Sequence, residues 1–157
     1  MLKGNHDYWW TTLNSMRKYI EENNFKNIDF IYNNSYMYEN TIICGTKGWG
    51  YGEKSEDKKL LKRENIRLEL SIEDGIKKYG EEKDIIVCMH YPPSNNSEIS
   101  NEMNFITTMR KYDRIKRCIY GHIHGEPFNG RMEGNIKGIE FNLVSSDYLK
   151  FKLIKII

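Results

Sequence analysis

Four histidines stand where their side chains could carry out chemistry. His6 lies in the motif Gly-Asn-His-Asp, and His90 is followed by Tyr-Pro-Pro. His122 and His124 lie in Gly-His-Ile-His-Gly. Imidazole is the commonest ligand for transition-metal ions at neutral pH, and it also acts as an acid or a base. A single histidine is usually a surface residue or a satisfied core residue, but four at the starts of loops favour a functional site.

The segments before three of these histidines are typical of buried strands. Asp84–Met89 is a nearly continuous apolar run that ends next to His90, and Arg117–Tyr120 is a shorter run before His122 and His124. The strands of an open α/β sheet direct the residues at their carboxyl ends into one crevice. The glycines on both sides of His-Ile-His would let the chain turn and aim both rings at one point. The sequence therefore predicts a metal site at this edge of a sheet.

The elements that must position these residues alternate between helix and strand. Apolar spacings of three and four predict helices over residues 10–23, 55–79 and 102–112. Short apolar or β-prone runs predict strands over residues 28–32, 41–45, 84–89 and 117–120, with one or two more within 138–157. The pattern predicts an α/β fold, a layered β-sheet sandwich flanked by helices.

Several apolar residues are predicted to form the core. The helical spacing assigns core positions to Leu13, Met16, Ile20, Leu61, Leu68, Ile72 and Ile76. The three cysteines lie in apolar runs and are interpreted as small buried residues rather than as a disulfide framework or a zinc site. Trp9 and Trp10 are also predicted to be core residues. Trp49 and Tyr51 lie among glycines, where they would either pack in the core or stack on a substrate ring.

The composition is that of one soluble domain over residues 1–157. Lys and Arg total 24 against 22 Asp and Glu, so the net charge is only +2, which argues against nucleic acid as a partner. No apolar run approaches the roughly 20 residues that span a bilayer, and the first residues do not resemble a signal peptide. We therefore expect no membrane partner and a cytoplasmic location.

The order of the histidine motifs resembles that of the calcineurin-like metallophosphoesterase superfamily. Gly-Asn-His-Asp, then a histidine at a strand end, then Gly-His-Ile-His occur in the family's order. Further segments resemble a bacterial branch of predicted phosphohydrolases, namely residues 45–52, 63–64, 67–71 and 89–93. The basic runs 54–63 and 110–117 are interpreted as solvated helix faces, and Arg63 with Glu64 as an ion pair.

The resemblance implies a role for each motif residue. It implies two divalent metal ions, Mn, Fe or Zn, and as their ligands it implies Asn5, His90, His122 and His124. His6 matches the general acid that protonates the leaving-group oxygen, and Asp7 matches the carboxylate that orients His6. Such a carboxylate fixes the tautomer of the ring and raises its basicity. A pair of metal ions would clamp the phosphoryl oxygens and activate the nucleophile.

Two blocks of the family pattern are not found in the sequence. Asp-x-His and Gly-Asp-x-x-Asp precede Gly-Asn-His-Asp in the family, whereas here only three residues precede Gly4. We therefore expect a partial domain, truncated at its N-terminus, with an exposed sheet edge. Because those blocks would supply the negatively charged ligands, we expect at most one, weaker metal site, formed by Asn5, His90 and His122.

Three hypotheses follow for the function. The first is a metal-dependent hydrolase of phosphate mono- or diesters that acts on a phosphorylated small molecule. The second is an inactive family member or a half-protein, which would act with a complementing N-terminal fragment or as a homo-oligomer. The third is a mononuclear metal-binding module without catalysis.

Overall fold

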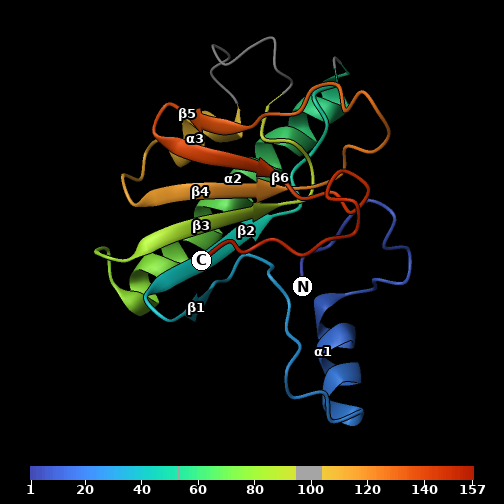
Figure 1. The fold of residues 1–157 in the computed structure, drawn as a ribbon. Coiled ribbons are helices and arrows are strands. Elements are labelled where there is room, and N and C mark those ends of the chain that lie inside the picture. Colours follow the sequence, from blue (N-terminus) through green and yellow to red (C-terminus); the bar gives the residue numbers. More distant parts are fainter. Residues whose placement is uncertain (53, 95–103) are drawn as a thin grey trace.

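A mixed β-sheet forms the centre of the protein. The computed structural model describes residues 1–52, 54–94 and 104–157. Within these residues one six-stranded sheet has the order β1-β2-β3-β4-β6-β5 (Figure 1). Its strands are β1 (Tyr36–Tyr38), β2 (Thr41–Thr46), β3 (Asp84–Met89), β4 (Ile115–Tyr120), β5 (Gly134–Ile136) and β6 (Ile139–Leu143). The four central strands are parallel to one another, and the two edge strands, β1 and β5, run antiparallel to their neighbours. This arrangement confirms the predicted α/β class.

Two helices cover one face of the sheet, and a third lies apart from it (Figure 1). The helices are α1 (Leu13–Glu22), α2 (Ser55–Tyr79) and α3 (Phe105–Met109). The amide of Ser15 donates to the side chain of Thr12 at 3.2 Å, which caps the N-terminus of α1. α2 has acidic residues in its first turn and lysines in its last, which favours the helix dipole, and it ends at Gly80. No helix within the described ranges is long and apolar enough to cross a membrane.

The main core lies between α2 and the sheet. Leu61, Leu68 and Ile72 on one side of α2 are buried, as their spacing predicts, and Ile76 is partly buried against the same core. They pack with sheet residues that include Ile42, Cys44, Val87, Cys118 and Phe141. Cys44 and Cys118 are fully buried and all three cysteines are free, so they act as small apolar residues.

A smaller, separate cluster holds α1 and the N-terminal segment. Trp10, Met16 and Phe30 form its buried centre, and Leu13 and Ile20 pack around it. The rings of Trp10 and Phe30 meet edge to face with their centroids 4.7 Å apart. The prediction for Trp10 is therefore confirmed. The prediction for Trp9 was wrong, because 54% of that side chain is exposed.

The predicted strand over residues 28–32 is absent from the described structure, and the short strand before β2 is β1 instead. The amide of Ile31 donates to the carbonyl of Met1 at 2.8 Å, and the Met1 amine to the carbonyl of Asp29, so the segment is tied to the N-terminus without forming a strand. Side chains of Asp29 and Asn34 accept hydrogen bonds from nearby amides, at 2.7 and 2.6 Å. Such local bonds compete with a strand ladder.

The remaining predicted elements differ from the structure mainly at their ends. β2, β3 and α2 lie where they are predicted, and β4 begins two residues earlier than its predicted strand. The helix predicted over residues 102–112 is shorter, because α3 ends at Met109, while residues 102 and 103 lie outside the described residues. Within residues 138–157 one strand forms among the described residues, β6, and its partner β5 lies wholly before that range.

Candidate functional site

Three predicted site residues meet at the carboxyl edge of the sheet. His90 directly follows β3, His122 follows β4, and Asn5 comes from the N-terminal segment, which runs past the same edge (Figure 1). Nε2 of His90 lies 2.6 Å from Oδ1 of Asn5 and 3.1 Å from Nδ1 of His122. The structure thus gathers one amide oxygen and two imidazole nitrogens at a single point, as expected at the ends of parallel strands.

The surroundings keep both imidazoles neutral. Burial, and after it the charges of His122 and Lys47, lower the pKa of His90 to about 4. Burial and the charge of His124 also lower the pKa of His122. The neutral ring is the form that offers a lone pair to a cation, so neither residue must lose a proton near pH 7 before it can bind one.

The backbone at His122 is in an uncommon conformation. Its φ is 71°, in the left-handed region that residues with a side chain rarely adopt. The predicted turn at the glycines of this motif occurs at Gly125, with φ 77°, and at His122 itself. The His122 ring is packed on Tyr91, with centroids 4.2 Å apart. A strained residue held by packing at a cluster of polar groups is typical of a functional site.

Asp7 stabilises the loop that carries Asn5. Oδ2 of Asp7 accepts the amide of Gly4 at 2.6 Å, and a Cβ at Gly4 would lie 3.2 Å from the His90 ring. Over the part of the chain that the structure describes, no hydrogen bond joins Asp7 to His6. The orienting contact implied by the resemblance is therefore replaced by a contact with Gly4. His6 is exposed, with its ring centroid 5.9 Å from that of Tyr8.

His124 is held apart from the cluster by a residue that the sequence analysis missed. Its Nδ1 donates to Oδ1 of Asp147 at 2.9 Å, and the amide of Gly125 donates to the other oxygen at 2.9 Å. These two hydrogen bonds hold the pKa of Asp147 below its usual value, and the bond from Gly125 has the larger effect. A carboxylate on Nδ1 leaves Nε2 of His124 as the acceptor. Asp147 lies shortly after β6, so the strand-end rule that identified the histidines would have found it.

The donor set fits one divalent cation better than two. Amide oxygen and imidazole nitrogen are both ligands of Mn, Fe and Zn ions. Asn5, His90 and His122 offer three such atoms, and each of these atoms lies at most 3.1 Å from another of the three. However, the described residues contain no group of three or more His, Cys, Asp or Glu side chains placed to hold a metal ion. The three donor atoms that meet at Asn5 are all neutral.

A hollow of about 280 Å³ opens next to this cluster. Its wall is largely aromatic and includes Trp49, Tyr51, Tyr91 and His122. Ser94 also lines it; this residue is buried, and its hydroxyl has no hydrogen-bond partner among the described residues. Small-molecule sites are commonly concave and apolar with a few polar groups, and this hollow has that character.

Comparison with known proteins assigns the chain to a family. The model of the calcineurin-like phosphoesterases matches residues 1–126, which include every predicted site residue. Neither the comparison with curated proteins nor that with solved structures gave a match. The family match agrees with the α/β sheet and with the motifs at its carboxyl edge. The chain belongs to the calcineurin-like phosphoesterase family.

Proposed function

We propose that this protein hydrolyses phosphate mono- or diesters of small molecules in a reaction that depends on a divalent cation. The observation that carries the proposal is the meeting of Asn5, His90 and His122 at the carboxyl edge of the sheet in a member of a phosphoesterase family. These three residues would hold the cation. A bound cation of this kind supplies Lewis-acid activation of the phosphoester and of water.

The N-terminal loop would supply the proton for the leaving group. His6 is exposed beside the proposed cation ligand Asn5, so its ring is accessible to a bound ester. Its role would be to protonate the leaving oxygen as the phosphorus–oxygen bond breaks. The contact between Asp7 and Gly4 supports this role by fixing the turn from which Asn5 and His6 extend.

The aromatic hollow beside His122 would accept the organic part of the substrate. Its volume of about 280 Å³ suits a small molecule, and its walls of Trp49 and Tyr91 favour a flat or apolar group. The small net charge of +2 favours a small molecule over a nucleic acid.

Metal binding is the first test of the proposal. The purified protein would be dialysed against Mn, Fe or Zn, and the bound metal measured by elemental analysis. We expect about one ion per chain in the monomeric protein, and none in His90→Ala. Tyr38→Ala is the control, because this exposed residue ends β1 and pairs with Thr41 at the amino end of β2, away from the carboxyl ends of the central strands. Metal binding that is unaffected by His90→Ala would contradict the proposed ligand set.

Hydrolysis is the second test. We expect the metal-loaded protein to cleave p-nitrophenyl phosphate or its bis-ester, and the metal-free protein to be inactive. His6→Ala should lower kcat by about 10²–10⁴-fold while the bound metal is unchanged, since general acid catalysis is worth that factor. Metal binding without hydrolysis of either ester would instead favour a binding module, which the neutral donor set also suits.

We also propose that negative ligands are contributed by a second chain, either another copy or a complementing fragment. The support is that the described residues contain no group of three or more His, Cys, Asp or Glu side chains placed to hold a metal ion. Light scattering with and without metal would show a larger species in the metal-loaded state. Two ions per chain, reduced to one by His124→Ala, would indicate that this completed site has formed.

A further inference from the structure

A second and larger hollow lies beside the proposed cation site. It has a volume of about 400 Å³ and is bordered by the N-terminal segment, the loop after β2 and the start of α2. Its charged lining residues are four cations and one carboxylate, namely Lys3, Lys47, Arg63, Arg67 and Glu64. With ordinary ionisation the lining thus carries three more positive than negative charges. We refer to this hollow as the basic cleft.

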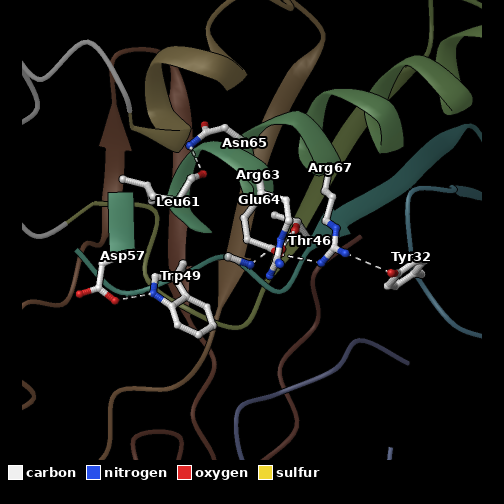
Figure 2. A network of polar contacts seen from close by, with 10 residues as sticks. Tyr32, Thr46, Trp49, Asp57, Leu61, Arg63, Glu64, Asn65 and Arg67 are labelled. Atoms are coloured by element: carbon white, nitrogen blue, oxygen red, sulfur yellow. Dashed lines mark hydrogen bonds and ion pairs between the residues drawn. The ribbon is translucent and has the colours of Figure 1, made fainter. Parts of the chain in front are cut away.

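The carboxylate in the cleft is already fully engaged. Glu64 is only 2% exposed, and its Oε2 accepts the hydroxyl of Thr46 at 2.7 Å (Figure 2). Its Oε1 accepts Nη1 of Arg67 at 2.7 Å. The other arm of Arg67 donates to the hydroxyl of Tyr32 at 3.1 Å. Glu64 therefore balances Arg67 and fixes its guanidinium group to the cleft wall.

The other three cations are left without a strong acidic partner. Arg63 is half exposed and reaches Glu64 only at 3.4 Å. Nζ of Lys47 lies over the rings of Trp49 and Tyr91, 5.1 and 5.7 Å from their centroids. No ion pair to Lys3 or Lys47 occurs within the described part of the chain. Burial, and next the charge of Lys3, lower the pKa of Lys47, which fits cations that crowd one another.

Lys47 and Trp49 link the basic cleft to the surroundings of the proposed cation site. The carbonyl of Lys47 accepts the amides of His90 and Tyr91, at 3.2 and 3.0 Å. Trp49 lines both the basic cleft and the aromatic hollow. A ligand bound at the Asn5 cluster would therefore lie near the side-chain amine of Lys47.

We propose that the basic cleft binds a phosphate-type oxyanion, and that this is a second anionic group on the substrate whose phosphoester lies at the Asn5 cluster. The assignment to the substrate rests on the proposed function. Guanidinium groups bind such oxyanions through paired hydrogen bonds. Arg63 contacts Glu64 through Nη2 alone, at 3.4 Å, so its other N–H groups can donate to an oxyanion. Partial burial strengthens the attraction beyond what the same charges give in water.

Inorganic phosphate tests the binding site without catalysis. Isothermal titration at low ionic strength, on protein freed of metal by a chelator, should show saturable binding of phosphate. Arg63→Gln and Lys47→Met should each weaken it at least fivefold. Lys62→Gln is the matched control, because it removes one exposed charge next to Arg63 but does not line the cleft. No saturable binding, or equal losses in all three variants, would overturn the proposal.

The variant His90→Ala separates this proposal from the proposed function. In metal-free protein it should bind phosphate as the unsubstituted chain does, because the cleft does not include His90. Loss of phosphate binding in His90→Ala would show that the anion binds at the cation cluster, and the proposal would fail. An inactive protein that still binds phosphate through Arg63 would overturn only the proposed function.

Kinetics distinguish a substrate group from free phosphate. Butane-1,4-diol bisphosphate should have a KM at least fivefold lower than that of the monophosphate. Arg63→Gln should remove this difference by raising the KM of the bisphosphate, whereas the control Lys62→Gln should keep it. Equal KM values for the two esters in the unsubstituted chain would overturn the assignment of the cleft to the substrate.

Discussion

At the scale of single residues, Glu64 shows how a buried charge is accommodated. A buried carboxylate loses its hydration, and this cost is offset only when hydrogen bonds and an opposite charge replace the water. Thr46 and Arg67 provide them, each at 2.7 Å. The ion pair of Arg63 and Glu64 that the sequence predicts is present at 3.4 Å, but Arg67 makes the closer contact.

The substitution Glu64→Gln tests this account. We expect it to lower the free energy of unfolding by about 1–3 kcal/mol, because the neutral amide loses the charge-assisted bond to Arg67. Urea denaturation followed by circular dichroism measures the change. The control is Glu56→Gln, at an exposed position in the first turn of the same helix. Free energies of unfolding that differ by less than about 0.5 kcal/mol between the two variants would contradict this account.

The left-handed backbone at His122 makes a second prediction. An L-residue with a side chain pays about 1–2 kcal/mol for this conformation, and glycine does not. His122→Gly should therefore be about 0.5–1 kcal/mol more stable than His122→Ala, after the greater flexibility of unfolded glycine is subtracted. Thermal unfolding of the two metal-free variants decides the point. An alanine variant that is the more stable would mean that φ relaxes after the ring is removed.

Single-residue roles could be predicted only where the sequence places residues in recognisable motifs. Three of the histidines were found because they follow apolar runs, and His6 because it lies in Gly-Asn-His-Asp. Asp147 was missed because residues 138–157 were predicted as one or two strands, with no strand end placed before Asp147. The basic cleft was missed because Lys3, Lys47 and Arg67 come from distant segments, and only the fold brings them together.

At the scale of elements, close backbone contacts set the positions of β2, β3 and α2. A Cβ at Gly45 would lie 1.9 Å from the carbonyl oxygen of Cys88 in the neighbouring strand. A Cβ at Gly75 would lie 2.5 Å from the side chain of Ile42. Gly45 lets β2 lie close to β3, and Gly75 lets α2 lie close to β2. Because Lys47 follows β2 and Glu64 lies on α2, this packing positions both residues at the basic cleft.

Alanine at Gly45 should therefore be strongly destabilising. We expect Gly45→Ala to cost at least about 3 kcal/mol, since the nearest atom belongs to a backbone that cannot move without breaking the ladder. Gly50→Ala is the matched control, because nothing lies within 4 Å of a Cβ built there. Chemical denaturation of both variants measures the difference. A cost for Gly45→Ala below about 1 kcal/mol would show that β2 can shift.

Element prediction succeeded where the hydrophobic pattern was long and failed where local polar bonds intervened. α2 and β3 have extended apolar patterns and were predicted with correct bounds. Residues 28–32 have strand-like composition, but Asp29 and Asn34 bind nearby amides and keep the segment out of the sheet. The pattern of apolar residues does not record this competition.

At the scale of the whole molecule, two separate hydrophobic clusters stabilise different parts of the fold. The larger one joins the sheet to α2 and α3, and the smaller one joins α1 to Trp10 and Phe30. A small cluster has less apolar area to lose, so the part that it stabilises opens at a lower free energy. We therefore expect α1 to exchange its amide hydrogens before the central strands do.

The substitution Met16→Ala tests that division. It should speed hydrogen exchange in α1 at least tenfold and leave the amides of β3 and β4 unchanged, because Met16 is buried only in the smaller cluster. Met37→Ala is the control, at an exposed position of β1. Exchange that rises equally throughout the protein would show that the two clusters unfold as one unit.

The proposed cation ligands come from both parts of the molecule. Asn5 lies in the segment that leads into the smaller cluster, and the carbonyl of Asp7 accepts the amide of Trp10 at 3.1 Å. His90 and His122 belong to the sheet. A cation held by all three would link the N-terminal segment, which the smaller cluster stabilises, to the more stable sheet. Its measured affinity would then be the intrinsic affinity multiplied by the fraction of molecules in which the N-terminal segment is packed in place.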